Sequence, residues 1–187
     1  FAEVLSSGTI QTGSMMTVEF PAKDRPFTAA VITMSDKGSK GERKDESGPA
    51  MKEGLTAAGF DVVEELILPD EKALLKKELI RLCDQRQVSL ILTSGGTGFS
   101  ERDTTPEATI EVMTRNAPGI AEAIRAESMK YTKRAMLSRG ASVIRGQTLI
   151  VNLPGSPKAV RESMEIILES VQHGLGILRG SESECAR

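Results

Sequence analysis

Apolar residues recur along the chain in a pattern that alternates between short strands and amphipathic helices. Runs such as FTAAVITM and VSLILTS are nearly continuously apolar, which is typical of strands in a parallel sheet covered on both faces. PDEKALLKKELIRLCDQ instead places apolar residues at 74, 75, 79 and 82, the spacing of one helical face. Strands are predicted at 27–34, 61–68, 88–94 and as a pair within 141–155, and helices at 47–60, 69–85, 106–116, 118–131 and 156–180. This order predicts an α/β fold, a three-layer α/β/α sandwich with a mainly parallel sheet.

The same pattern divides the chain into one domain and two flanking segments. Residues 1–25 lack periodicity and are rich in Ser, Gly and Thr, so they are interpreted as an N-terminal extension or expression remnant. The native start would then be Met15 or Met16. Residues 26–180 hold every predicted element, and residues 181–187 form a short polar tail.

Composition narrows the classes of function. The chain is 39% hydrophobic and 27% charged, as in ordinary globular proteins. Only 3% of its residues are aromatic and its formal net charge is −2, which argues against nucleic-acid binding. No apolar run approaches the 18 or so residues of a membrane helix. Cys83 and Cys185 have no metal-ligand spacing, and Cys83 is interpreted as a core or near-surface thiol. A reducing cytoplasm is therefore expected.

The polar and glycine-rich residues gather after the predicted strands. Ser35 and Asp36 follow the first strand within SDKGSKGERKDES, predicted as a loop of twelve or so residues. Pro69-Asp70 follows the second strand, Gly95-Gly96-Thr97-Gly98 the third, and Leu153-Pro154-Gly155-Ser156-Pro157 the last. In open α/β sheets, ligands bind beyond the carboxyl ends of the strands. Four loops are therefore expected to converge on one edge and form a site.

The Gly-Gly-Thr-Gly loop allows backbone N–H groups to approach an anion, because no Cβ stands in the way. A tight turn is the simpler interpretation of a glycine cluster alone. The spacing matches neither a Walker P-loop nor the Rossmann fingerprint. Asp103 lies on the same loop just before a helix start, where Thr105 is expected to be the cap, which leaves Asp103 available to a metal or ligand.

Asp70 has two compatible interpretations. It suits the N-cap of the helix that follows, and it lies at a strand end next to the predicted glycine loop. Two carboxylates beside a phosphate cradle suggest Mg²⁺ that bridges to a nucleotide phosphate. Asp70 and Asp103 are therefore the candidate metal ligands.

The LPGSPK segment has a similar chemistry. Gly155 allows close approach, and the helix start at Ser156 presents N–H groups to an anion, while Lys158 and Arg161 add positive charge nearby. The single histidine, His173, falls late in the last predicted helix, which disfavours a histidine base at this site. A reaction whose nucleophile is already ionised, such as nucleotidyl transfer to a phosphate, needs no such base.

These motifs together resemble the molybdenum-cofactor biosynthesis domain over about residues 27–180. The resemblance is carried by Leu68-Pro69-Asp70, by Ser94-Gly-Gly-Thr-Gly98, by Arg102-Asp103-x-Thr105-Pro106-Glu107-Ala108, and by Asn152-Leu153-Pro154-Gly155-Ser156-Pro157-Lys158. Within the family, the chain is most similar to molybdopterin adenylyltransferases of the Mog type and of gephyrin-like G domains.

The resemblance implies that the terminal phosphate of molybdopterin attacks the α-phosphorus of ATP and that pyrophosphate leaves. It implies Mg²⁺ with Asp70 and Asp103 as the critical catalytic and metal-binding pair. Nucleotide binding is implied for Gly95, Gly96, Thr97, Gly98 and Arg102, and pterin binding for Ser35, Asp36, Pro154, Gly155, Ser156 and Lys158. It further implies a homotrimer that passes its product to a molybdenum-insertion protein.

Two rival interpretations remain. A sister branch of the family, the MoaB type, shares the fold, but its members often depart at the positions of Pro69-Asp70 and Arg102-Asp103, which are intact here. The other rival is a non-enzymatic trimeric scaffold that holds pterin or a partner protein. The intact aspartate pair argues against the scaffold, which has no use for a metal.

Overall fold

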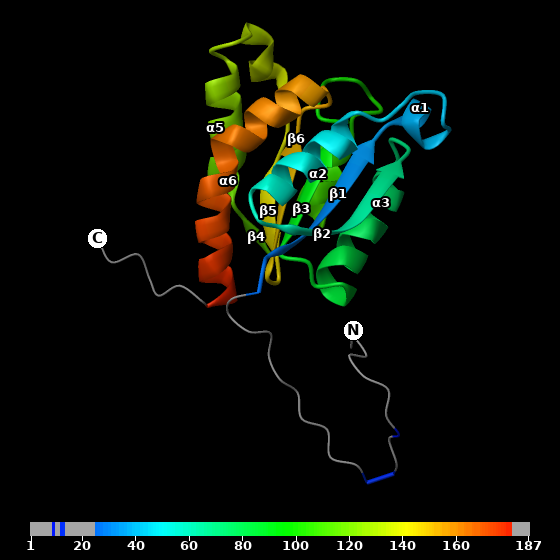
Figure 1. The fold of residues 1–187 in the computed structure, drawn as a ribbon. Helices are drawn as coiled ribbons and strands as arrows, with labels where there is room; N and C mark the ends of the chain where they lie inside the picture. Colours follow the sequence, from blue (N-terminus) through cyan, green and yellow to red (C-terminus); the bar gives the residue numbers. More distant parts are fainter. Residues whose placement is uncertain (1–8, 10–11, 14–24, 181–187) are drawn as a thin grey trace, which may run out of the picture.

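The computed structural model describes residue 9, residues 12–13 and residues 25–180, which form a central sheet with helices on both faces (Figure 1). The strands are β1 (Thr28–Met34), β2 (Asp61–Leu68), β3 (Leu90–Ser94), β4 (Arg115–Asn116), β5 (Ser142–Arg145) and β6 (Thr148–Leu153). They form one six-stranded sheet in the order β2-β1-β3-β6-β5-β4. The pairs β1–β2, β1–β3 and β3–β6 are parallel, whereas β4–β5 and β5–β6 are antiparallel. The expected mainly parallel sheet is confirmed.

The helices are α1 (Asp36–Ser39), α2 (Ser47–Ala57), α3 (Lys72–Ile80), α4 (Thr105–Glu111), α5 (Pro118–Ser128) and α6 (Pro157–Arg179). A π-helical turn, Arg81–Gln85, continues α3, and a 3₁₀ segment, Lys133–Leu137, follows α5. None of the helices in the described part of the chain has both the length and the apolar character that crossing a bilayer would take.

Side chains alternate across the strands and build two cores, one on each face of the sheet. Ala29 and Val31 of β1 pack with α2, α5 and α6, whereas Ala30 and Ile32 of the same strand pack with α3 and α4. Successive residues of a strand point to opposite faces, so a strand buried on both faces must be apolar throughout. Cys83 lies in the second core, which confirms it as a buried thiol. Its burial raises the pKa of the thiol to about 11, so little of the reactive thiolate forms at neutral pH.

The structure corrects the predicted boundaries in several places. The predicted loop at 35–47 contains the short helix α1, because the Ser35 hydroxyl accepts a hydrogen bond from Gly38 N (3.0 Å) and caps a single turn. The helix predicted at 69–85 begins only at Lys72, and the one at 106–116 ends at Glu111. Strand β4 and the 3₁₀ segment were not predicted. Nearly all of the predicted extension 1–25, and the tail 181–187 with Cys185, lie outside the described residues.

One buried polar side chain joins the end of the sheet to its surroundings. Asn152 is only 3% exposed, and its amide nitrogen donates to the hydroxyls of Thr93 on β3 and Thr109 on α4 (both 2.9 Å). Its amide oxygen accepts from the backbone N–H of Ala141 (3.0 Å). These bonds hold β6 in place beside β3, α4 and the segment that enters β5.

We expect Asn152→Leu to lower the free energy of unfolding by about 3 kcal/mol, because it leaves several buried polar groups without partners. Asn116→Leu on the exposed edge strand β4 is the matched control and should change it by less than about 0.5 kcal/mol. Urea denaturation of both variants makes the comparison. Equal stability of the two variants would show that the Asn152 bonds contribute nothing net.

Candidate active site at the carboxyl ends of the strands

The four predicted loops meet at one edge of the sheet. Thr33 of β1 lies opposite Ser94 of β3, which lies opposite Leu153 of β6, so the three strands end at the same level. Ser35 N donates to Leu68 O (2.8 Å), which links the ends of β1 and β2. The Ser94 hydroxyl donates to Pro154 O (2.9 Å), which links the ends of β3 and β6. The predicted convergence is therefore confirmed.

Asp36 and Asp70 are joined by two hydrogen bonds, each from the backbone N–H of one residue to the carboxylate of the other. Asp36 N donates to Asp70 Oδ2, and Asp70 N donates to Asp36 Oδ1, each at 3.1 Å. The residue that caps α3 is Glu71, which makes no side-chain capping bond. The interpretation of Asp70 as an N-cap is thus wrong, because its carboxylate points to the loop after β1 and not to its own helix.

The two carboxyl groups have opposite electrostatic surroundings. The guanidinium of Arg102 donates to Asp36 from Nε (3.1 Å) and from a terminal nitrogen (2.6 Å), and these bonds lower the pKa of Asp36. Burial raises the pKa of Asp70, and the negative charges of Asp36 and Asp103 add to that effect. Burial is thus the main cause that disfavours the charge of Asp70, and the nearby Arg102 opposes it only in part.

Gly95 and Gly96 have backbones that only glycine adopts easily, with φ of +95° and +63°. A Cβ added to Gly95 would lie 2.5 Å from the carbonyl oxygen of Met34, so the loop passes directly against the end of β1. A Cβ added to Gly96 would lie 3.3 Å from Asp70 Oδ1, and one added to Gly98 would lie 2.9 Å from Asp103 Oδ2. The missing side chains thus let the loop lie between the two carboxylates.

Asp103 forms a local turn. Its Oδ2 accepts from Ser100 N (2.9 Å), and its backbone N–H donates to Ser100 O (2.9 Å). The cap position of α4 belongs to Thr104, so the expectation that Thr105 is the cap is wrong. Thr105 is the first helical residue, and its hydroxyl is buried against Gly96 without a hydrogen-bond partner. Asp103 therefore combines the turn role with a position beside the glycine loop.

The LPGSP turn completes this edge of the site. Gly155 lies directly against Gly95, because a Cβ added to it would be 3.4 Å from Gly95 Cα. The Ser156 hydroxyl accepts from Ala159 N (3.2 Å) and caps α6, which confirms the predicted helix start. The side chain of Lys158 is 87% exposed and lies 3.8 Å from Glu162. His173 lies 16 residues beyond the start of α6, about 24 Å along the helix axis.

Two site residues were missed by the sequence reasoning. Asp45 accepts from Ser47 N (2.9 Å), from Gly48 N (3.1 Å) and from the hydroxyl of Thr33 (2.9 Å), and so fixes the start of α2. The Ser47 hydroxyl then donates to Gly155 O (3.0 Å). The pattern Asp-x-Ser before a helix was a readable capping signal for Asp45.

The second missed residue is Arg139, which precedes β5. Its backbone N–H donates to Thr97 O (2.9 Å) and its Nε donates to Gly98 O (2.7 Å). Its terminal nitrogens bond Asp103 O and the carboxylate of Glu107. No pattern in the sequence points from residue 139 to this loop.

The donor set of this edge fits Mg²⁺. Within the described residues, no cluster of three or more His, Cys, Asp or Glu side chains is arranged to hold a metal ion. Mg²⁺ in nucleotide sites, however, commonly takes one or two carboxylates and completes its shell with phosphate oxygens and water. Asp70 and Asp103 on the two sides of the glycine loop supply that number of carboxylates. The raised pKa of Asp70 indicates that a bound cation would be favourable there.

Comparison with known proteins places the chain in a family. Residues 30–173 match the family model described as "Probable molybdopterin binding domain". The chain belongs to this molybdopterin-binding domain family. A molybdopterin adenylyltransferase of Helicobacter pylori is 40% identical over 153 residues, which cover 81% of this chain and 87% of the relative. The molybdopterin adenylyltransferase of Escherichia coli is 40% identical over 152 residues, which cover 78% of this chain and 77% of the relative.

Solved structures of the family share the fold. The molybdopterin biosynthesis enzyme MoaB of Thermus thermophilus has a TM-score of 0.78 and 45% sequence identity, over 82% of this chain and 97% of that one. The expected α/β/α fold of the molybdopterin-binding domain family is thus confirmed. Residues 30–173, which the family model matches, include all four loops of the site.

We expect Gly95→Ala to lower the free energy of unfolding by about 3 kcal/mol or more, because the new Cβ meets the Met34 carbonyl in a left-handed backbone. Gly119→Ala in α5 is the control, since a Cβ there meets nothing within 4 Å. It should raise the free energy of unfolding by up to about 1 kcal/mol, because alanine favours the helix. Chemical denaturation measures both. A Gly95→Ala protein as stable as wild type would show that the loop relaxes freely.

The two neighbouring carboxyl groups should affect stability with opposite signs. The pKa of Asp70 in the folded protein is raised above 3.8, the ordinary pKa of an aspartate. The stability that Asp70 contributes is therefore present below pH 3.8 and is lost as the pH rises through the folded pKa. Asp70→Asn should therefore raise the melting temperature at pH 7 by roughly 1–3 °C, with the difference vanishing below pH 3.8.

Asp36→Asn is the comparison, since the folded pKa of Asp36 is lowered. Its stabilising effect is present above pH 3.8 and is lost as pH falls through the folded value, so the variant should melt below wild type at pH 7. Melting curves from pH 3 to pH 8 test both signs. A lower melting temperature of Asp70→Asn at pH 7 would contradict the burial of its charge.

Proposed function

We propose that the chain is a molybdopterin adenylyltransferase that uses ATP and Mg²⁺. The observation that carries the proposal is the placement of Asp70 and Asp103 on both sides of the Gly95–Gly98 loop, at the edge where four loops meet. The adenylyltransferases of Helicobacter pylori and Escherichia coli, each 40% identical over most of this chain, support it.

In the proposed reaction, an oxygen of the terminal phosphate of molybdopterin attacks the α-phosphorus of ATP. A new P–O bond forms, the bond from the α-phosphorus to the α,β-bridging oxygen breaks, and pyrophosphate leaves with the electron pair. The attacking phosphate is already ionised at neutral pH, so no protein base has to remove a proton. Mg²⁺, when bound, would neutralise charge that develops on the phosphate oxygens.

The residues of this chain have separate roles in the proposal. Asp70 and Asp103 would hold the metal ion, whose charge would favour the ionised form of Asp70 against the burial that raises its pKa. The N–H groups of Gly95, Gly96, Thr97 and Gly98 hold the nucleotide phosphates, with Arg102 beside them. Arg102 forms an ion pair with Asp36 in the structure, and its side chain is 57% exposed. It is therefore accessible to a phosphate.

The pterin substrate is proposed to lie on the opposite side of the glycine loop. Ser35 and Asp36 line the site from the end of β1. Pro154, Gly155, Ser156 and Lys158 line it from the start of α6, where the helix N-terminus favours the phosphate of the substrate. The two groups of loops would thus bring the attacking phosphate and the α-phosphorus together between them.

Three further properties are proposed from the family resemblance. The chain would work as a homotrimer in the cytoplasm and would pass adenylylated molybdopterin to a molybdenum-insertion protein. The domain boundaries at residues 26 and 180 also remain a prediction.

A second candidate is a pterin-binding protein of the MoaB type. The Thermus thermophilus MoaB structure, which is 45% identical and covers 82% of this chain, supports this candidate. Both candidates share the pterin site, and only the adenylyltransferase releases pyrophosphate.

We expect pyrophosphate release from ATP in the presence of molybdopterin and Mg²⁺, and its loss with EDTA. Asp103→Asn should lower the rate at least 100-fold, about 3 kcal/mol of transition-state stabilisation, because it keeps the size of the side chain and removes its charge. Asp84→Asn is the matched control, since Asp84 pairs with Arg145 away from the site, and should retain the rate within about twofold.

The outcomes separate the candidates. If the wild-type protein binds molybdopterin but releases no pyrophosphate, it is a pterin-binding relative. If Asp103→Asn retains the wild-type rate, Asp103 is not a metal or transition-state residue, even where the enzyme is active.

A further inference from the structure

Arg139 bonds three carbonyl groups of the loop between β3 and α4, which holds both the Gly95–Gly98 stretch and Asp103, and it also bonds α4. Its backbone N–H bonds Thr97 O, and its guanidinium bonds Gly98 O, Asp103 O and the carboxylate of Glu107. One residue from outside the loop therefore restrains both the glycine end of the loop and the end that carries Asp103.

These carbonyl bonds also orient the backbone N–H groups of the loop. The described chain has no cis peptide bonds, and in a trans peptide unit the C=O and the N–H point in opposite directions. The carbonyls of residues 97, 98 and 103 point toward Arg139, so the N–H groups of Gly98, Phe99 and Thr104 point away from it. Of these, the Gly98 N–H is one of the four groups proposed to hold the nucleotide phosphates, and N–H groups turned to one side of a loop can form an anion-binding concavity.

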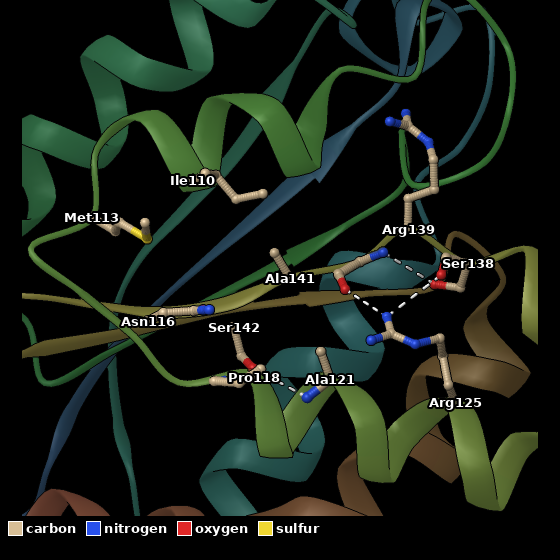
Figure 2. Close-up of a pocket in the computed structure, with 11 residues that line it drawn as sticks. Ile110, Met113, Asn116, Pro118, Ala121, Arg125, Ser138, Arg139, Ala141 and Ser142 are labelled. Carbon is tan, nitrogen blue, oxygen red and sulfur yellow. Dashed lines mark hydrogen bonds between the residues drawn. The ribbon is translucent and has the colours of Figure 1, made fainter.

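The segment that carries Arg139 is itself fixed by contacts with α5 and β6. Arg125 of α5 donates to Gly140 O (2.7 Å) and to Ser138 O (3.4 Å), and Ala141 N donates to Asn152. Residues 138–142 line part of a cavity of about 340 Å³, and Figure 2 shows the side chains around it. The Arg125 side chain points to the carbonyls there, whereas that of Arg139 extends away from the cavity. The backbone around Arg139 is thus held by Arg125 and Asn152, neither of which belongs to the loop.

We propose that Arg139 is a positioning residue that sets the geometry of the phosphate-binding loop and of Asp103. The inference deepens the proposed function and rests on it. Only the planar fork of an arginine reaches three acceptors in fixed directions, and a lysine ammonium on its single flexible stem does not. A displacement of about 1 Å in a reacting group lowers rates by about 100-fold.

Arg145 provides a matched control. It donates twice to the carboxylate of Asp84 (2.9 and 2.6 Å) and once to Val112 O (2.8 Å), so it also has three side-chain bonds to a carboxylate and to backbone. Its partners lie on the π-helical turn and at the end of α4, and none belongs to the loops of the site. A structural role alone would make the two arginines equivalent.

The experiment compares Arg139→Lys with Arg145→Lys by limited trypsin digestion, followed by mass spectrometry of the fragment that ends at Arg102. Arg102 lies on the loop that Arg139 holds, so cleavage there reports local opening of the loop. We expect cleavage after Arg102 to be at least tenfold faster in Arg139→Lys than in wild type. Arg145→Lys should be within about twofold of wild type.

Pyrophosphate release gives the second measurement. We expect Arg139→Lys to lower kcat about 30- to 100-fold, with the KM for molybdopterin within about threefold, because the pterin contacts lie on other loops. Arg145→Lys should retain both constants while its melting temperature falls. The proposal is overturned if Arg139→Lys matches Arg145→Lys in the rate of cleavage after Arg102, or if the two variants have equal kcat.

The two measurements distinguish failure of this inference from failure of the proposed function. If the wild-type protein releases no pyrophosphate, the proposed function fails, and the digestion comparison still decides whether Arg139 holds the loop. If Arg139→Lys does not fold, Glu107→Gln replaces it, since it removes the charge that Arg139 bonds on α4. It should raise cleavage after Arg102 severalfold, and wild-type cleavage would overturn the proposal.

Discussion

The parallel pairing of β1, β3 and β6 is the constraint on which the rest of the structure depends. Because Thr33, Ser94 and Leu153 lie opposite one another, the segments that leave the three strands start at one level of the sheet. Each of these segments turns sharply, and their contacts with one another follow from that common start. The site is therefore assembled from parts of the chain that are far apart in sequence, and it cannot form before the sheet has formed.

The charges gathered at this edge do not stabilise the fold equally. Asp36 has a cation beside it in Arg102, whereas Asp70 is more buried and faces the negative charges of Asp36 and Asp103. Carboxylates whose charge is disfavoured by burial and by neighbouring negative charges cluster at functional sites. A cation bound at this edge would account for the arrangement, because its positive charge would make the surroundings of the Asp70 carboxylate favourable.

Local sequence patterns predicted the fold well because each strand and helix has its own periodicity. The alternation of apolar runs identified β1, β2 and β6 and the capped start of α6, and it placed the four loops at one edge. It failed at Asp70 and Thr105, where a residue suited to capping has a different role. The partners of Asp70 lie tens of residues away, as in the bonds between Asp36 and Asp70, and a capping pattern read over four residues contains no information about them.

The loop after β3 needs both close approach to its neighbours, which its glycines allow, and a fixed geometry, which Arg139 provides. Glycines at 95, 96 and 98 let the backbone pass between neighbouring loops and carboxylates, but residues without a Cβ also give the loop more conformations to lose on folding. Restraint has to come from contacts outside the loop, and Arg139 supplies it through its bonds to the carbonyls of Thr97 and Gly98. Close approach and fixed geometry are thus provided by different parts of the chain, which explains why the glycine motif was visible in the sequence and its support was not.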